Sequence, residues 1–231
     1  MFEKLRNPWK RIINPIAVLL VRMGVSANAV TVAGAVGTVV VGIATGFTGW
    51  LLPGAILLTV LVIFDSLDGS VAALTTGGTK FGAFLDSTLD RIADWAVLVC
   101  VIIYFLREFV AAGAGISDVA CDSGTSQGGP DAVAWIGAAC ALFAVMTSFV
   151  TSYARARAES VGFEAKNGVA TRSDRLVIIL VGMALTGATG TPVWLMAFMV
   201  LLAVLGAVTV WQRIREVHRQ MAAAGDGKAR S

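Results

Sequence analysis

Two long segments of this chain contain no charged residue, and they restrict its fold more than any other feature. The first covers 42 residues, from Met23 to Phe64, and the second covers 37, from Leu176 to Gln212. A helix that crosses the hydrocarbon layer needs about 20 residues, so each segment has room for one span and most of another. With 57% hydrophobic and 14% charged residues among 231, the chain is predicted to be an all-α integral membrane protein.

Glycine, proline and polar clusters divide this sequence into six predicted transmembrane helices. Gly49 to Pro53 marks the first turn, 75–80 (TTGGTK) a short loop, and 108–131 the longest loop. The fourth helix is expected to continue as a polar extension to Glu159. The predicted helices cover residues 27–48, 53–74, 82–107, 132–154, 174–188 and 192–212.

Basic residues predict how the chain lies in the membrane. Residues 1–25 alternate Lys and Arg with apolar side chains at helical spacing, which predicts an amphipathic interfacial helix. A disordered basic tail is the alternative.

A six-helix domain over 26–214 and a disordered cytoplasmic tail over 215–231 are expected to follow this segment. With both termini in the cytoplasm, 17 of the 18 Lys and Arg lie on or near that side and only Arg107 lies opposite. The positive-inside rule favours this orientation in the plasma membrane.

Four aspartates lie within this membrane-class sequence: Asp65, Asp68, Asp86 and Asp90. The first two are three residues apart and the last two are four apart, so each pair lies on one face of a helix. Carboxylates are costly in hydrocarbon and need compensating cations. Lys80 and Arg91 are expected to be the only positive charges nearby. Two cations cannot neutralise four acids, which indicates bound divalent metal. Oxygen ligands favour Mg²⁺, Mn²⁺ or Ca²⁺ over zinc.

The short loop at 75–80 predicts that the second and third helices pack as a hairpin. All four aspartates would then face one cavity, about 8–14 Å below the cytoplasmic end. Two metal ions there suit transfer at a phosphorus centre, and Gly69 and Gly82 allow a bulky ligand to approach the backbone. Four arginines at the same membrane face are candidates for holding a second, phosphorylated substrate, with topology marking as the alternative: Arg155, Arg157, Arg172 and Arg175.

The spacing of the aspartates and glycines resembles the signature of the CDP-alcohol phosphotransferase family, D-x2-D-G-x2-A-R-x8-G-x3-D-x3-D. This chain departs at one position, where Ala73 stands in place of the family's arginine. The family has six transmembrane helices and an amphipathic N-terminal segment, so the resemblance covers nearly the whole chain. Four more stretches are similar to the actinobacterial phosphatidylinositol phosphate synthases in particular: 28–31 (NAVT), 78–83 (GTKFGA), 152–159 (SYARARAE) and 172–176 (RSDRL).

This resemblance implies a function and a role for each candidate residue. The implied reaction joins CDP-diacylglycerol to inositol 1-phosphate: Asp90 accepts a proton from an inositol hydroxyl, the oxygen attacks the β-phosphorus, and CMP leaves. It implies a homodimer among membrane lipids, with two Mg²⁺ or Mn²⁺ ions and an active site facing the cytoplasm. The implied metal ligands are Asp65, Asp68, Asp86 and Asp90. The implied CDP-diacylglycerol contacts are Asn28, Thr31, Asp65, Gly69, Ala73, Thr79 and Gly82, and the implied inositol phosphate contacts are Arg155, Arg157, Arg172 and Arg175.

Two other functions stay open at the level of the sequence. A phosphatidylglycerophosphate synthase would share the metal motif and take glycerol 3-phosphate as its acceptor. A divalent-cation transporter would use the aspartates as a transport site, but it needs access from both faces and the acids cluster near one. No nucleic-acid partner is expected.

Overall fold

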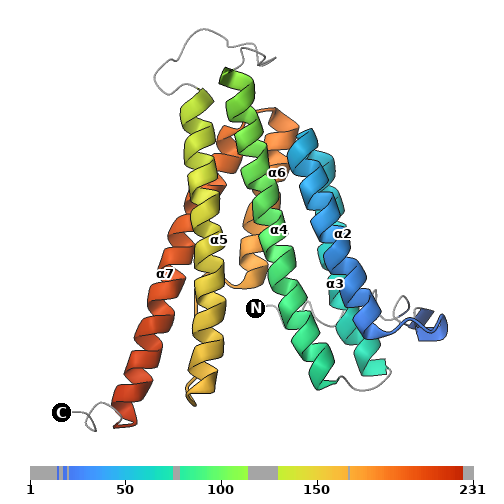
Figure 1. The fold of residues 1–231 in the computed structure, drawn as a ribbon, viewed down its shortest axis with the longest axis vertical. Coiled ribbons are helices and arrows are strands. Elements are labelled where there is room, and N and C mark those ends of the chain that lie inside the picture. The colour runs from blue at the N-terminus through green and yellow to red at the C-terminus, as the bar shows by residue number, and fades with distance from the viewer. Residues whose placement is uncertain are drawn as a thin grey trace.

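The computed structural model describes residues 15, 18–19, 21–74, 79–113, 130–165 and 167–225, apart from the side chains of 65–74, 113, 130 and 131. Over this part the chain is an all-helical bundle without strands (Figure 1). Its helices are α2 (Ala27–Thr48), α3 (Leu51–Leu74), α4 (Lys80–Gly113), α5 (Pro130–Ser160), α6 (Arg172–Thr189) and α7 (Val193–Ala223). Most of the predicted interfacial helix at 1–25 lies outside the described residues.

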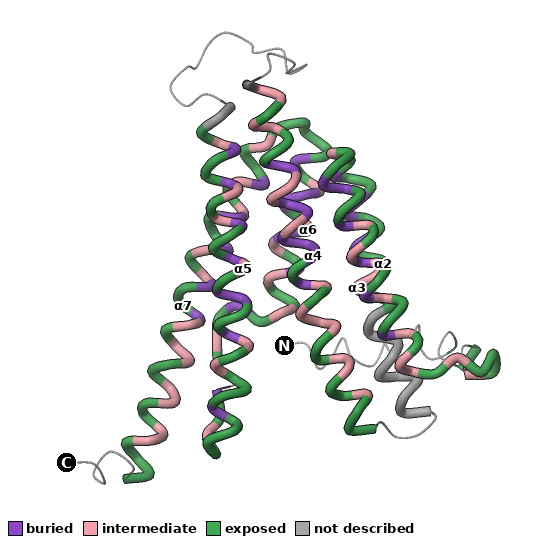
Figure 2. The backbone as a smooth tube through the Cα atoms, in the orientation of Figure 1, coloured by how far each residue is buried: buried purple, intermediate pink, exposed green. Residues whose placement is uncertain are grey.

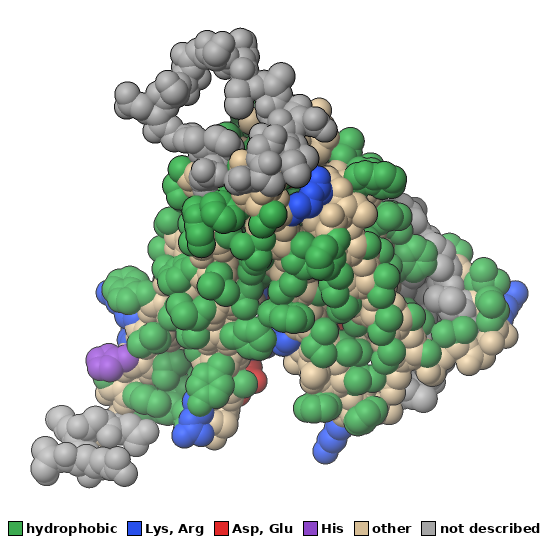
Figure 3. Space-filling model, turned by 45° about the horizontal axis from the view of Figure 1, so that its top comes forward, with side chains coloured by type: hydrophobic (Ala, Val, Ile, Leu, Met, Phe, Trp, Pro, Cys, Tyr) green, Lys and Arg blue, Asp and Glu red, His purple; other side chains and the backbone are tan. Residues whose placement is uncertain are grey.

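Length and composition suit this bundle to a membrane. Four of the described helices are long and apolar enough to cross one: α2, most of α4 and α5, and α7. Helix α3 has a shorter apolar stretch, Leu51–Phe64, over its described side chains. Exposed residues cover the outside of the bundle (Figure 2), and large apolar side chains spread over its flank (Figure 3). Such a large apolar surface is typical of a protein whose solvent is lipid.

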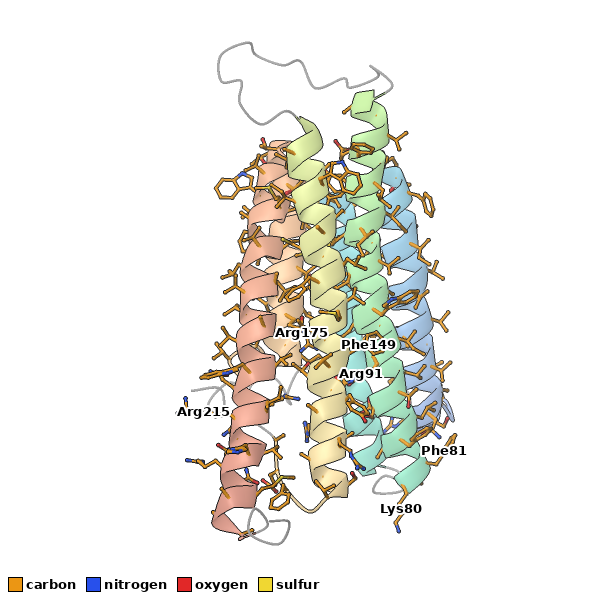
Figure 4. The ribbon with its side chains drawn as sticks, turned by 60° about the vertical axis from the view of Figure 1, so that its left-hand side comes forward. Lys80, Phe81, Arg91, Phe149, Arg175 and Arg215 are labelled. Carbon is orange, nitrogen blue, oxygen red and sulfur yellow. The ribbon has the colours of Figure 1, made fainter. Side chains whose placement is uncertain are left out.

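Successive helices run in opposite directions, so α2, α4 and α6 begin toward the end of the bundle where α3, α5 and α7 finish (Figure 1). Lys80, Arg91, Arg175 and Arg215 all lie in this half of the molecule (Figure 4). We call it the basic end.

Glycines set the packing of α2 against α4. A Cβ atom at Gly46 would lie 2.8 Å from the carbonyl oxygen of Cys100, and one at Gly42 would lie 3.3 Å from that of Ala96. Small residues one turn apart therefore let the two helices approach closely. In the described part α3 packs against α2 and α6, and α4 packs against α2, α5 and α6. The predicted hairpin between 53–74 and 82–107 depends on residues 75–78 and on the side chains of 65–74, which lie outside the described part.

The connection between α5 and α6 packs against the C-terminal half of α7. The side chain of Gln220 accepts a hydrogen bond from the Glu164 amide at 3.0 Å and donates one to its carbonyl at 2.8 Å. The Arg213 guanidinium donates to the Asn167 carbonyl at 3.1 Å. These contacts stabilise a helix that continues to Ala223. The prediction of disorder from residue 215 is therefore wrong as far as Ala223; residues 226–231 lie outside the described part.

A capping box fixes the start of α6. The amide and hydroxyl of Thr171 both donate to the Asp174 carboxylate, at 2.9 and 2.6 Å, which satisfies donors at the helix N-terminus. The helix consequently begins at Arg172, before the predicted residue 174. This start places Arg172 and Arg175 on the first turn of α6, at the basic end.

Candidate functional site

A cavity of about 840 Å³ lies between α4 and α5 at the basic end. This size falls within the usual range for ligand pockets, about 300–1,000 Å³. The wall combines carboxylates, hydroxyls and arginines with large apolar side chains, a mixture that suits a ligand with a charged and an apolar part. Its lining includes Asp86, Ser87, Asp90, Arg91, Ile92, Trp95, Phe149, Tyr153, Arg155 and Glu159.

Two of the four predicted metal ligands are described, and both line this cavity. Asp86 and Asp90 lie one turn apart on α4, so their carboxylates share a face of the helix. Their hard oxygen atoms fit Mg²⁺ or Mn²⁺. The side chains of Asp65 and Asp68 lie outside the described part, and the described side chains alone bring no three His, Cys, Asp or Glu together.

Asp90 has a cationic partner that the sequence argument did not count. Arg172 on α6 contacts the Asp90 carboxylate at 2.9 Å and Asp94 at 3.0 Å. The prediction that Lys80 and Arg91 are the only cations near the acids is therefore wrong, because the fold brings the start of α6 against the middle of α4. Charge compensation alone consequently demands less metal than the sequence indicated.

Asp94 is a site residue that sequence reasoning missed. Its side chain is only 4% exposed, and it binds Arg175 at 2.7 Å as well as Arg172. The signal was present, because Asp94 follows Asp90 by the same four residues that separate Asp90 from Asp86. It lies outside the family signature, and both partners come from a distant helix.

A second missed residue, Arg213 on α7, joins the predicted arginines. The positive charges of Arg155, Arg175 and Arg91 all act on its guanidinium, which donates to the carbonyl oxygens of Thr151 and Asn167. Within the described residues, neither Arg91 nor Arg213 forms an ion pair with a carboxylate. Four arginines from α4, α5, α6 and α7 therefore lie within electrostatic reach of one another, two of them also paired with carboxylates. We call them the basic cluster: Arg91, Arg155, Arg175 and Arg213.

The two predicted arginines on α5 have different surroundings. Arg155 lines the cavity and pairs with Glu159 at 3.0 Å. Arg157 is exposed, contacts the Ser160 hydroxyl at 3.3 Å, and does not line the cavity. The structure therefore brings Arg155 into the site and leaves Arg157 outside it.

Three of the predicted CDP-diacylglycerol contacts meet where α2 and α4 begin. The Gly82 amide donates to the Thr79 hydroxyl at 2.9 Å. A Cβ atom at Gly82 would lie 3.1 Å from both this hydroxyl and the side-chain oxygen of Asn28. Glycine thus leaves room for both polar side chains beside the α4 backbone, because a Cβ atom here would require them to shift by a few tenths of an ångström. Thr31 is buried instead, with its hydroxyl donating to the Ala27 carbonyl at 3.1 Å. The other predicted contacts, Asp65, Gly69 and Ala73, belong to the stretch 65–74 whose side chains lie outside the described part.

This arrangement has the parts that transfer of a charged phosphoryl group requires. Carboxylates on α4 face a cavity from one side, and the basic cluster supplies positive charge nearby. Cations placed where phosphate charge accumulates stabilise such a reaction electrostatically. The apolar part of the cavity wall leaves room for a lipid-linked substrate.

Comparison with protein families finds one model that covers most of the chain. The model for CDP-alcohol phosphatidyltransferases matches residues 24–211, which include every residue of the signature and most of the basic cluster.

Curated relatives and solved structures are similar over nearly the full length. The phosphatidylinositol phosphate synthase of Cutibacterium acnes is 38% identical over 226 residues, covering 95% of this chain and 98% of the relative. That of Corynebacterium glutamicum is 34% identical over 90% of this chain and 85% of its own. The crystal structure of the Mycobacterium tuberculosis enzyme with CDP-DAG bound has a TM-score of 0.74 and 32% identity, covering 90% of this chain and 94% of that one. A second structure of that enzyme, with manganese and citrate, has a TM-score of 0.74, 31% identity and coverage of 89% and 88%.

Proposed function

This chain belongs to the CDP-alcohol phosphatidyltransferase family, and on that basis we propose that it transfers the phosphatidyl group of CDP-diacylglycerol to inositol 1-phosphate. The products are phosphatidylinositol phosphate and CMP. The observation that carries the choice of acceptor is the similarity to phosphatidylinositol phosphate synthases over 95% of the chain. The cavity with carboxylates on α4 and the adjacent basic cluster supports the reaction class.

The donor lipid is proposed to bind where α2 and α4 begin. Asn28 and Thr79 offer polar side chains there, and Gly82 keeps the backbone accessible. Asp65, Asp68, Asp86 and Asp90 would hold two divalent ions, Mg²⁺ or Mn²⁺, which neutralise phosphate charge and orient the pyrophosphate when bound. Manganese in the similar Mycobacterium tuberculosis enzyme supports this assignment.

The acceptor is proposed to bind with its phosphate at the basic cluster. Arg155 lines the cavity from α5, and Arg175 on α6 and Arg213 on α7 belong to the same cluster of charges. Asp90 then removes the proton from an inositol hydroxyl, and the oxygen forms a new bond to the β-phosphorus. The bond from the β-phosphorus to the bridging oxygen breaks, and CMP leaves with that oxygen.

We extend the proposal to the membrane arrangement. Six spans over residues 26–214 place both termini and the basic end in the cytoplasm, since the positive-inside rule favours Lys and Arg there. The protein acts as a homodimer in the plasma membrane. This orientation gives the water-soluble acceptor direct access to the basic end.

Purified protein in lipid vesicles tests the proposed function. Labelled inositol 1-phosphate and labelled glycerol 3-phosphate are each supplied with CDP-diacylglycerol and Mg²⁺, and lipid label and CMP are measured together. Incorporation of inositol phosphate with equal release of CMP supports the proposal. Incorporation of glycerol phosphate alone would instead identify a phosphatidylglycerophosphate synthase, and Mg²⁺ flux without CMP would identify a transporter.

Two arginines on α5 provide a matched test of the acceptor site. Arg155→Gln should raise the KM for inositol 1-phosphate about 10- to 150-fold, because a charge-assisted hydrogen bond is worth roughly 1.5–3 kcal/mol. Arg157→Gln, two residues along the same helix but outside the cavity, should leave that KM nearly unchanged. Steady-state CMP release with the acceptor varied measures both. If neither substitution changes the acceptor KM, these arginines are topology signals only.

Ala73 provides a test of the donor site. The family arginine at this position assists the nucleotide end of the lipid, and alanine supplies neither charge nor hydrogen bond. Ala73→Arg should therefore raise kcat/KM for CDP-diacylglycerol at least several-fold and up to about a hundredfold, the contribution of one charged hydrogen bond. The acceptor KM should stay constant. A gain confined to the acceptor, or no gain, would show that this position does not serve the nucleotide in this protein.

A further inference from the structure

Asp94 is the most deeply buried charged side chain in the described part of the bundle, at 4% exposure. One carboxylate oxygen accepts a hydrogen bond from Arg172 Nε at 3.0 Å, and the other accepts one from Arg175 at 2.7 Å. Both arginines come from the first turn of α6. Burying a carboxylate is costly unless it is fully paired, and here both of its oxygen atoms are engaged.

The two arginines that Asp94 holds lead to different parts of the site. Arg172 uses a second nitrogen to contact Asp90 at 2.9 Å. Arg175 belongs to the basic cluster, where its charge acts on Arg213. Asp94 thus joins the acidic and the basic parts of the site through side chains that it contacts directly.

Few other contacts connect the helices that carry this network. Helix α4 packs mainly against α2 and α5, and α6 mainly against α3 and α7. The ion pairs of Asp94, together with that between Asp90 and Arg172, therefore help to fix the start of α6 relative to α4. Arg172 is held by two carboxylates and Arg175 by one. A planar guanidinium fixed in this way has less freedom to reorient, which lowers the entropy cost of binding a further anion.

We propose, on the basis of the function proposed above, that Asp94 is a positioning residue for the acceptor. Its carboxylate orients Arg175 toward the acceptor phosphate and holds Arg172 against Asp90, and it does not itself touch substrate. The competing explanation is that Asp94 only clamps α4 to α6 and contributes stability.

A matched pair of substitutions separates the two explanations. Asp94→Asn keeps the size of the side chain and removes the charge that holds both arginines. Asp174→Asn weakens the cap of the same helix α6 without touching either arginine. For each variant, thermal unfolding and the KM of each substrate are measured in the same detergent or vesicles.

Positioning predicts a selective effect. Asp94→Asn should raise the KM for inositol 1-phosphate about tenfold or more, since the acceptor loses a preorganised charged partner, and change the KM for CDP-diacylglycerol less than about twofold. Asp174→Asn should lower the unfolding temperature and leave the KM values of both substrates unchanged. The proposal is overturned if Asp94→Asn changes only the unfolding temperature, or changes both KM values equally.

A double-mutant cycle tests whether Asp94 acts through Arg175. If it does, the Asp94→Asn/Arg175→Gln double variant should have an acceptor KM within about twofold of Arg175→Gln alone, because the two residues act as one unit. Multiplicative effects would contradict the proposal. If Asp94→Asn does not fold, Asp94→Glu replaces it: the charge is kept, the longer side chain displaces both arginines, and the acceptor KM should still rise selectively. An unchanged acceptor KM in Asp94→Glu would then overturn the proposal.

The wild-type protein distinguishes a failure of this proposal from a failure of the proposed function. If the wild type incorporates no inositol 1-phosphate, the proposed function fails and the positioning role fails with it. If the wild type is active and Asp94→Asn has no selective effect on the acceptor, only the positioning role is lost.

Discussion

Asp86→Asn is expected to abolish turnover, with a loss of at least about 10³-fold in kcat. Asp86 lines the cavity on α4 one turn before Asp90, and within the described residues no ion pair with an arginine or lysine compensates its charge. A carboxylate placed in this way is available to bind a divalent cation. Metal ions contribute several kcal/mol to reactions at phosphorus, and about 1.4 kcal/mol corresponds to tenfold in rate. Loss of the ion should therefore reduce CMP release to background.

A binding measurement identifies the cause of this loss. Mn²⁺ titration followed by electron paramagnetic resonance should show weaker binding in Asp86→Asn, and a chelator should inactivate the wild type reversibly. Glu159→Gln removes a negative charge from the same cavity but not from the predicted ligand set, so its Mn²⁺ affinity should match the wild type. Near-normal turnover of Asp86→Asn without added metal would refute the metal site.

The sequence was sufficient to predict the helices where local signals mark their ends. Helix α2 covers the predicted 27–48 because Ser26 caps its start and Gly49, with φ of 74°, ends it. The predicted third helix ends at 107 and the predicted sixth at 212 because charged residues follow at these points. Charge does not stop a helix, however, and α4 and α7 continue to Gly113 and Ala223.

The candidate site was predictable only where its residues are neighbours in the sequence. The spacing of Asp86 and Asp90 places both in one cavity, as expected. The partners of Asp94 lie 78 and 81 residues away, so only the fold shows which arginines compensate it. Arg213 is the first charged residue after an apolar run. At such a position the sequence does not distinguish an arginine that marks the end of a membrane span from one that binds a substrate.

The ion pairs also change the electrostatic argument for metal. Two carboxylates, Asp90 and Asp94, share two guanidinium groups, from Arg172 and Arg175. Among the described side chains these charges cancel, whereas the side chains of Asp65 and Asp68 lie outside the described part. The case for metal at Asp90 therefore depends on its neighbour Asp86 and on the signature. Asp90 is therefore the predicted ligand whose role most needs an experiment.

Asp90→Asn is expected to lower kcat by about 10²–10⁴-fold, the usual contribution of a general base. The Asp90 side chain is 18% exposed and lines the cavity, so a substrate hydroxyl can reach it. Arg172 contacts the carboxylate at 2.9 Å and restricts its orientation. Asparagine has nearly the same shape but cannot accept that proton.

The comparison of Asp90→Asn with Asp86→Asn distinguishes a base from a metal ligand. A residue that acts chiefly as a base affects the transition state alone, so kcat should fall while the KM for CDP-diacylglycerol stays nearly constant. Because Asp90 is also one of the four proposed metal ligands, Mn²⁺ affinity should fall in both variants, but less in Asp90→Asn than in Asp86→Asn. If Asp90→Asn instead loses Mn²⁺ affinity and donor binding in proportion to turnover, Asp90 serves mainly as a ligand. The proton would then have to leave the inositol hydroxyl through another group.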